Sequence, residues 1–305
     1  MAARLLAPLG ALYGMSVAWK ARHARPRRAA IAVICVGNLT AGGSGKTPIA
    51  IAIAEALIAR GQKPFFLTRG YGGRQAGPLL VTPNHTAAMV GDEALLLART
   101  APTIVARDRA AGAMLAQAQG AGVVVMDDGH QNFSLHKDLA LVVVDGVSGF
   151  GNGLMIPAGP LREPVTQGLA RAGAVVIVGE GAPGLEGFPG PVLRARLQAG
   201  EEFLRGKKIF AFAGIGRPEK FLASLQEAGA VLAGTRWFAD HHPYRVGEIA
   251  ALREAAKDAE LVTTEKDLVR IAPAYRGGIA VLAVRAIFDD PSALAALLDS
   301  LGPAV

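Results

Sequence analysis

The chain has 305 residues, of which about half are apolar and 19% are charged, so it can bury a sizeable core and is not a disordered protein. Its single cysteine, Cys35, excludes a disulfide framework within the chain and fits a reducing compartment such as the cytosol. The net charge of +7 is concentrated in residues 1–28, whereas nucleic-acid-binding proteins spread their cations over a folded face, so we expect no nucleic-acid partner.

Residues 1–28 form an N-terminal arm that combines an apolar run with a basic cluster and contains no Asp or Glu. The uncharged run Leu5–Trp19 is shorter than the ~20 residues that span a bilayer, and most of the charge follows it, unlike in a secretory signal. As a helix it would present one apolar face, made of Leu5, Leu9, Leu12 and Trp19. This order predicts a membrane-associating helix with its arginines on anionic head groups; the alternative is a core helix with a solvated basic tail.

After the arm, apolar runs with the character of buried strands alternate with helical patterns, which predicts α/β layers. The runs show no alternation of apolar and polar residues, as in a mostly parallel sheet that helices flank on both faces. The predicted strands are Ile31–Val36, Pro64–Thr68, Pro102–Ala106, Val123–Met126, Leu139–Val144 and Ala174–Val178. The predicted helices are Pro48–Arg60, Glu93–Thr100 and Arg109–Gln119.

The composition changes at Gly179–Pro191, where glycine and proline indicate a loop or linker. A second alternating set of strands and helices follows: Ile209–Ala213, Pro218–Ala228, Val231–Trp237, Val246–Ala256, Glu260–Thr263, Ile279–Val284 and Pro291–Ser300. We therefore predict a first domain over residues 29–200 and a second, smaller α/β domain over residues 201–305, with the boundary near residues 198–207.

The sequence Gly42-Gly43-Ser44-Gly45-Lys46-Thr47 joins the first predicted strand to the first predicted helix. Its glycines let backbone N–H groups turn toward phosphate oxygens, and the helix N-terminus adds partial positive charge. Lys46 suits the β- and γ-phosphates of a nucleoside triphosphate, and the Thr47 hydroxyl suits Mg²⁺. The motif predicts a domain of the P-loop NTPase type that binds ATP and Mg²⁺, although Thr40 stands where the usual pattern begins with glycine.

Two carboxylates, Asp127 and Asp128, follow a buried strand and should lie at the edge of the sheet beside the P-loop. P-loop proteins hold Mg²⁺ there, directly or through water, and the spacing leaves open which of the two binds it. A kinase also needs a group that takes or orients the proton of its acceptor hydroxyl. Asp92 and the cluster Asp240-His241-His242 are candidates, but Asp92 could instead cap a helix and the histidines could lie on the surface.

At these residues the chain resembles the tetraacyldisaccharide 4′-kinase family, the lipid A 4′-kinases of Gram-negative bacteria. The resemblance covers nearly the whole chain and rests on the order of several short motifs. These are Val36–Thr40 before Gly42–Pro48, Thr68–Gly72, Gly91–Glu93, Asp127–Gln131, Pro157–Glu163, Ala213–Ile215, Phe238–His242 and Thr263–Asp267. The family tends to carry threonine at the position of Thr40, whereas His130 stands where an apolar or aromatic residue often follows the glycine and stays unassigned.

The resemblance implies transfer of the γ-phosphate of ATP to the 4′-hydroxyl of tetraacyldisaccharide 1-phosphate, a lipid A precursor, giving lipid IVA. It implies a peripheral or monotopic enzyme on the cytoplasmic face of the bacterial inner membrane, with the acylated disaccharide and the membrane surface as partners and no protein partner. The catalytic residues would be Lys46 on the phosphates and a dyad in which His241, from the second domain, orients Asp92. Asp92 would take the proton from the acceptor.

The remaining polar residues of the motifs also receive roles from the resemblance. The Mg²⁺ ligands would be Thr47, Asp127 and Asp128. Gln131 and Glu163 would lie near the nucleotide or the metal. Phosphate or substrate contacts would fall to Arg69, Arg162 and Lys266.

Two other functions compete with a kinase. A switch ATPase of the partitioning or metal-insertion type would carry an extra lysine just before the two glycines of the loop, and Ala41 stands there instead. A membrane-bound nucleotide-binding scaffold without turnover would not need Asp92 and His241 on the acceptor side. Only an assay separates that scaffold from a kinase.

Overall fold

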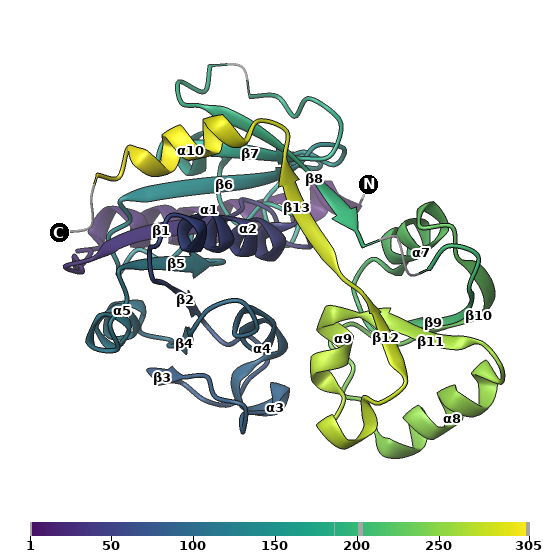
Figure 1. Ribbon diagram of the computed structural model, residues 1–305. Coiled ribbons are helices and arrows are strands. Elements are labelled where there is room, and N and C mark those ends of the chain that lie inside the picture. The colour runs from purple at the N-terminus through teal and green to yellow at the C-terminus, as the bar shows by residue number, and fades with distance from the viewer. Residues whose placement is uncertain (1, 186, 201–203, 303–305) are drawn as a thin grey trace.

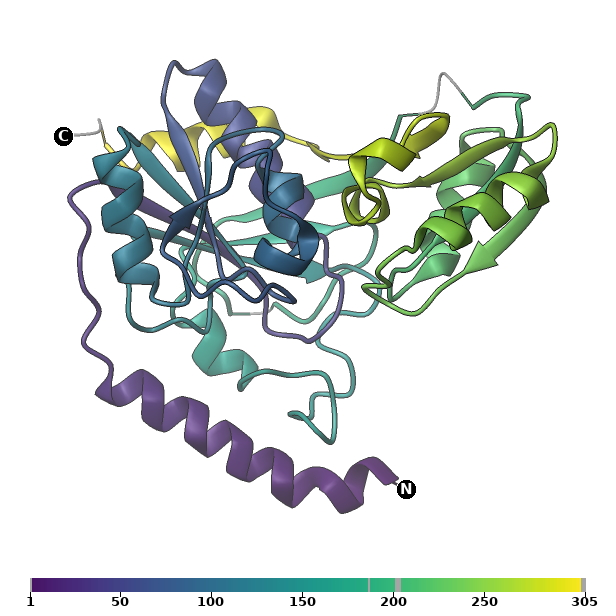
Figure 2. The ribbon, with the colours of Figure 1, turned by 90° about the horizontal axis from the view of Figure 1, so that it is seen from below.

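The computed structural model describes residues 2–185, 187–200 and 204–302. Within these ranges, a nine-stranded sheet and a four-stranded sheet form two units that lie side by side (Figures 1 and 2). The strands of the larger sheet are, in spatial order, β13 (Val284–Phe288), β8 (Val192–Ala199), β7 (Ala174–Val178), β6 (Leu139–Asp145), β1 (Ala32–Gly37), β5 (Val123–Asp127), β2 (Pro64–Thr68), β4 (Thr103–Val105) and β3 (Leu79–Leu80).

Neighbouring strands of the larger sheet are parallel except at its two edges, where β13 pairs antiparallel with β8 and β3 pairs antiparallel with β4. β1 lies at the centre, and its Cys35 pairs with Met126 of β5 on one side and with Ala140 of β6 on the other. The carboxyl ends of β1 and β5 therefore meet at the same edge of the sheet, and both the glycine-rich loop and the pair Asp127 and Asp128 lie there.

Helices cover both faces of the larger sheet, which explains why its strands are apolar without alternation. On one face pack α2 (Lys46–Ala59), α4 (Asp92–Leu97) and α10 (Pro291–Asp299). On the other face pack α5 (Arg109–Ala118) and a segment that contains α6 (Val165–Leu169). A short helix, α3 (Ala87–Val90), precedes α4. The predicted α/β fold with a mostly parallel, helix-flanked sheet is confirmed.

The smaller sheet is entirely parallel, with the order β10 (Val231–Trp237), β9 (Lys208–Ala213), β11 (Glu260–Thr264) and β12 (Ile279–Leu282). Two helices provide its apolar partners: α7 (Pro218–Glu227), through Phe221 and Leu225, and α8 (Val246–Ala256), through Ile249 and Leu252. The helix α9 (Glu265–Arg270) follows β11 directly, and a 3₁₀ turn covers Pro273–Tyr275. The predicted second α/β layer is therefore present.

The end of the chain differs from the expectation of one continuous unit over residues 201–305. The single strand predicted over Ile279–Val284 is two strands: β12 belongs to the smaller sheet, and β13 crosses to the edge of the larger one (Figure 1). α10 then buries Leu294 and Leu298 in the core of the larger unit. The glycine-rich segment also leads into β8, a strand that the sequence pattern did not predict because its residues alternate between buried and exposed only over part of its length.

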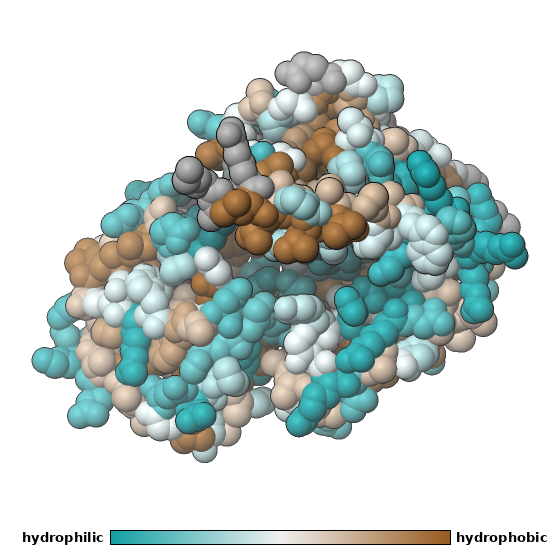
Figure 3. Space-filling model, turned by 180° about the vertical axis from the view of Figure 1, so that it is seen from behind, coloured by the Kyte–Doolittle hydropathy of each residue, from teal (hydrophilic) through white to brown (hydrophobic). Residues whose placement is uncertain are grey.

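The N-terminal arm folds as α1 (Ala2–His23), a long helix along the side of the larger unit (Figure 2). One side of the helix packs closely, since a Cβ on Gly14 would lie 2.3 Å from the sulfur of Met155. The opposite side exposes most of the predicted apolar face, with Leu5 79% and Trp19 63% exposed. Figure 3 shows this apolar stripe across the back of the molecule. The exposure excludes a core helix.

Among the described helices, α1 included, none combines the length and the apolar character that a membrane crossing demands.

Candidate active site

The P-loop runs from the end of β1 to the start of α2, and its backbone leaves the first turn of that helix open. Gly45 adopts a left-handed conformation, with φ of 84°, directly before α2 begins at Lys46. No described side chain caps this helix, so its first N–H groups are left for an anion. Within the loop, the buried side chain of Asn38 donates to Ser44 Oγ at 3.0 Å and so anchors the loop to the sheet.

Asp127 and Asp128 meet the P-loop at the end of β5, as the sequence predicts. Thr47 Oγ1 donates to Asp127 Oδ2 at 3.1 Å, and the other oxygen of this carboxylate is buried without a hydrogen-bond partner among the described residues. Asp128 accepts from Arg162 at 2.7 Å and lies 3.7 Å from Lys46 Nζ. A buried carboxylate oxygen without a donor, next to a threonine hydroxyl, fits a divalent cation with oxygen ligands.

The two carboxyl groups differ in their proton affinity. Burial raises the pKa of Asp127 to about 7, and the negative charges of Glu93 and Asp128 act in the same direction. Burial would also raise the pKa of Asp128, but Lys46 and Arg162 outweigh it and hold that pKa below the usual value. Lys46 and Thr47 offset only part of this rise, so Asp127 is the carboxyl group whose charge is incompletely compensated, and a bound metal ion would supply the missing positive charge.

Gln131 contacts the backbone just before the P-loop, and Glu163 contacts Gln131. Gln131 Nε2 donates both to the carbonyl of Asn38 at 2.8 Å and to Glu163 Oε1 at 2.9 Å. Glu163 is buried and also pairs with Arg171 at 2.5 Å. Both residues therefore lie close to the nucleotide loop, with their polar atoms engaged by protein groups.

His130, which the sequence leaves unassigned, is a buried packing residue. Its Cβ would lie 2.6 Å from a Cβ added to Gly37 at the end of β1, and its Nε2 is 3.0 Å from the carbonyl of Gly168. Burial and the nearby Lys137 lower the pKa of His130 to about 4, so the ring is neutral at physiological pH. Glycine at position 37 makes room for the backbone and Cβ of His130.

Asp92 is the first residue of α4, and Gly91, with φ of 86°, occupies the preceding cap position. The side chain of Asp92 is therefore not the helix cap, and it takes part in tertiary contacts. Its Oδ2 lies 2.9 Å from Nδ1 of His241, although the two residues are 149 positions apart. A Cβ on Gly91 would lie 2.4 Å from the carbonyl of Tyr71, so close packing of two motifs fixes the start of α4.

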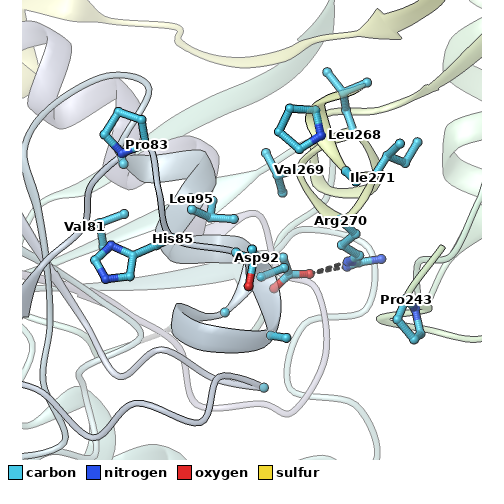
Figure 4. Close-up of a pocket in the computed structure, with 18 of the residues that line it drawn as sticks. Val81, Pro83, His85, Asp92, Leu95, Pro243, Leu268, Val269, Arg270 and Ile271 are labelled. Atoms are coloured by element: carbon cyan, nitrogen blue, oxygen red, sulfur yellow. Dashed lines mark hydrogen bonds and ion pairs between the residues drawn. The ribbon is translucent and has the colours of Figure 1, made fainter. Parts of the chain in front are cut away.

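Arg270 is the residue of this site that the sequence analysis missed. Its Nε donates to Asp92 Oδ2 at 2.7 Å, its NH2 group contacts the same oxygen, and its side chain is only 3% exposed (Figure 4). Burial would raise the pKa of Asp92, but Arg270 and His241 together hold it below the usual value. A signal was present, because Arg270 follows Asp267 of the last motif by three residues and ends α9 on the same helical face.

The three predicted substrate contacts lie in different surroundings. Arg162 pairs with Asp128, and Lys266 donates to Glu93 at 2.8 Å, next to Asp92. Arg69 follows β2 and is exposed. The neighbouring His242 points elsewhere, with its ring stacked on Phe238 and its Nε2 3.0 Å from Glu248.

A cleft of about 1150 Å³ opens beside Asp92 and His241 (Figure 4). The larger unit contributes residues 81–88 and one face of α4, and the smaller unit contributes residues 268–273. The walls are mainly apolar, while Asp92 and Arg270 lie at the boundary between the two units. The arrangement thus combines a loop before an uncapped helix N-terminus, a buried carboxylate oxygen without a donor among the described residues, and a histidine–aspartate pair that faces a cleft.

The comparisons with known proteins agree with this chemistry. A family model described as tetraacyldisaccharide-1-P 4′-kinase matches residues 2–302. Tetraacyldisaccharide 4′-kinase from Methylobacterium radiotolerans is 56% identical over 303 residues, with 96% of this chain and 92% of the relative covered. The enzyme of that name from Paramagnetospirillum magneticum is 54% identical, with 98% and 95% covered.

A solved structure shares the fold of the whole chain. The crystal structure of LpxK from Aquifex aeolicus in complex with ATP superposes with a TM-score of 0.81 at 23% sequence identity, and 99% of each chain is covered. Because the family model spans almost all residues and relatives more than half identical match from end to end, this chain belongs to the tetraacyldisaccharide 4′-kinase family.

Proposed function

We propose that this protein transfers the γ-phosphate of ATP to the 4′-hydroxyl of a tetraacyldisaccharide 1-phosphate in lipid A biosynthesis. Family membership gives the reaction and the class of acceptor. The observation that carries the proposal is the contact between Asp92 and His241, because a nucleotide switch or a scaffold has no use for such a pair on the acceptor side. The pair comes from two units and meets at a cleft, where an acceptor could enter.

ATP would bind with its phosphates in the P-loop and its metal at Asp127. The open first turn of α2 and the ammonium of Lys46 supply the positive charge, and the LpxK structure of the same fold is a complex with ATP. Thr47 and the unpaired oxygen of Asp127 would hold Mg²⁺, with Asp128 beside them. When bound, Mg²⁺ neutralises the charge that develops on the β- and γ-phosphates.

His241 is the better candidate for the atom that takes the acceptor proton. Arg270 keeps the pKa of Asp92 low, and an ionised carboxylate of this kind is a weak base but a good acceptor for the Nδ1–H of His241. With Nδ1 donating to Asp92, Nε2 is left as the acceptor atom of the ring, which is 36% exposed. This proposal reverses the roles that the resemblance implies, in which His241 orients Asp92 and Asp92 takes the proton: here Asp92 orients the ring of His241, and Nε2 accepts the proton.

Lys46 and the loop amides would stabilise the transferring phosphoryl group, while the dyad handles the acceptor. The amides are fixed before the reaction, so their stabilisation does not require reorganisation as charge develops. The approach of the smaller unit brings His241 to Asp92 and helps to exclude water, which would favour transfer over hydrolysis of ATP.

The exposed apolar face of α1 supports work at the cytoplasmic face of the inner membrane. An acylated acceptor is held in a bilayer, and α1 presents exposed leucines followed by Arg22, Arg25, Arg27 and Arg28. The double substitution Leu9→Gln with Leu12→Gln should reduce sedimentation with anionic phosphatidylglycerol vesicles. Ile58→Gln, which removes an exposed apolar side chain from α2, is the matched control. Equal binding of both variants would contradict a role for α1.

The direct test is ATP-dependent labelling of purified tetraacyldisaccharide 1-phosphate in detergent micelles with Mg²⁺. We expect label on the 4′-position of the lipid and little release of free phosphate. Parallel reactions contain simple sugars or no acceptor. Transfer to simple sugars with none to the lipid, or hydrolysis of ATP alone, would exclude the lipid kinase and favour the competing switch ATPase.

A further inference from the structure

Arg270 is a cation with a buried side chain through which the smaller unit contacts Asp92 of the larger unit. It is the last residue of α9, and it contacts three residues beyond its own helix. Nε and NH2 both contact Oδ2 of Asp92, while NH1 donates to the carbonyl of Gly214 at 2.6 Å. NH2 also lies 3.4 Å from Nδ1 of His241, so one guanidinium touches both members of the dyad.

A second buried carboxylate fixes the position of Arg270 itself. Asp267 is fully buried and accepts from Arg270 NH1 at 3.0 Å, from the Gly214 amide at 2.9 Å and from the Tyr244 hydroxyl at 2.8 Å. Its other oxygen accepts from Thr264 at 2.6 Å. Burial, together with Asp267, raises the pKa of Tyr244, so the phenol keeps its proton and continues to donate. These contacts hold the guanidinium in one orientation.

The donors to Asp92 divide between the two units. Oδ1 accepts from the amide of Glu93, which belongs to the same helix as Asp92. Oδ2 accepts only from Arg270 and His241 among the described residues, and both belong to the smaller unit. A buried aspartate without these partners would take up a proton or turn toward water, because an unpaired buried charge is costly.

We propose that Arg270 is a positioning residue for phosphoryl transfer: its guanidinium fixes Oδ2 of Asp92 against Nδ1 of His241 and makes the dyad depend on the apposition of the two units. The inference rests on the proposed function. A merely structural ion pair would contribute to stability and leave the chemistry unchanged. A positioning residue changes kcat and its dependence on pH, because the dyad works only while Asp92 is ionised and oriented.

Two substitutions separate these roles. Arg270→Gln removes the charge, and we expect kcat for the lipid acceptor to fall about 10-fold or more, with the KM for ATP close to that of the wild type. The acid limb of the kcat profile should move to higher pH, because loss of the cation that contacts both residues favours the protonated form of the Asp92–His241 pair. Arg270→Lys keeps the positive charge but lacks the planar guanidinium group. The acid limb should therefore lie where it does in the wild type, while kcat should recover only in part.

The control is Arg253→Gln, in the same unit, since among the described residues Arg253 donates to the carbonyls of Tyr275 and Gly277 alone. Thermal melting of every variant reports the folded fraction. If folded Arg270→Gln keeps the kcat and pH profile of the wild type, the proposal is wrong and the pair is structural. If that variant does not fold, Arg270→Lys decides: wild-type kcat overturns the proposal, and a reduced kcat with an intact acid limb supports it.

Failure of this inference is distinguishable from failure of the proposed function. In the first case Asp92→Ala and His241→Ala lose lipid phosphorylation while the Arg270 variants keep it. In the second case the wild-type enzyme does not label the lipid, or the dyad variants label it as well as the wild type does.

Discussion

The phosphate side and the acceptor side of this site are assembled differently. On the phosphate side, the P-loop, Asp127 and Arg162 all belong to the larger unit, and the pairing of β1 with β5 fixes their relative positions. On the acceptor side, Asp92 comes from the larger unit, whereas His241 and Arg270 come from the smaller one. We therefore expect substitutions to affect nucleotide binding and phosphoryl transfer separately, because only phosphoryl transfer depends on contact between the units.

The largest expected effect tests the phosphate side. Lys46→Ala removes the ammonium from the phosphates, so transfer should fall about 10³-fold and ATP affinity should fall with it. Steady-state kinetics and titration with a fluorescent ATP analogue measure the two quantities. Lys63→Ala, at an exposed lysine of the same unit, is the control. If Lys46→Ala bound ATP as tightly as the wild type, the phosphate side would not be the nucleotide-binding site, and the division into a phosphate side and an acceptor side would be wrong.

The next effect tests the acceptor side. Asp92→Ala and His241→Ala should each lower kcat about 10²-fold or more while ATP affinity stays near the wild-type value. The double variant should be little worse than either single one, because the two residues act as a pair. His242→Gln is the comparator, as its side chain contacts Glu248 and Phe238 instead of Asp92. Additive losses in the double variant would argue for two independent roles.

The third prediction concerns the stability of the metal-free phosphate side as pH changes. The pKa of Asp127 is raised from 3.8 to about 7, so between these values the folded protein holds a proton that the unfolded chain has lost. The free energy of unfolding should therefore fall as pH rises from 4 to 7 and level off above pH 7. Asp127→Asn should remove this dependence and stabilise the metal-free protein at pH 8, by on the order of a few kcal/mol at most.

The neighbouring substitution Asp128→Asn is a matched variant, and its effect on the free energy of unfolding should have the opposite sign. It loses Lys46 and Arg162 as partners, so it should destabilise the metal-free protein at pH 8. Thermal or chemical denaturation without metal measures both variants. Destabilisation by Asp127→Asn would show that this carboxylate is already compensated in the free protein and would weaken the case for a metal there.

The smallest effect tests the contact between the units away from the dyad. Asp145, at the end of β6, accepts from Lys220 of α7 at 2.8 Å and lies 3.6 Å from Arg217. Asp145→Asn should lower the free energy of unfolding at pH 7 by about 1 kcal/mol, because Lys220 is largely exposed, and should lower kcat slightly without changing ATP affinity. A change in ATP affinity alone would contradict the division between the two sides.

The pH dependence of this contact also has a defined sign. Despite burial, Lys220 and Ser148 lower the pKa of Asp145 to about 2. Its contribution to stability should therefore be complete above about pH 4 and be lost as pH falls toward 2. Comparing the wild type with Asp145→Asn by denaturation across this range checks the sign.

Much of the larger unit could be predicted because its signals are local. Buried parallel strands such as Val123–Asp127 are continuous apolar runs, and the glycine loop lies between one of them and a helix. β13, at the edge of the larger sheet, and its neighbour β8 escaped prediction because both strands mix exposed and buried residues. The return of the chain to the larger sheet after β12 follows from packing of α10 on that sheet, which no local pattern encodes.

The sequence by itself determined the P-loop, the carboxylates at the end of β5 and the family, because each depends on residue types within a few positions of one another. It also offered Asp92 and His241 as candidates, but it paired them only through resemblance. The tertiary structure alone decided that they touch, that Arg270 holds the same oxygen from 178 positions away, and that the apolar face of α1 stays uncovered. The physical reason is that a charge network between two units depends on burial and on distances in space, and separation along the chain carries no information about either.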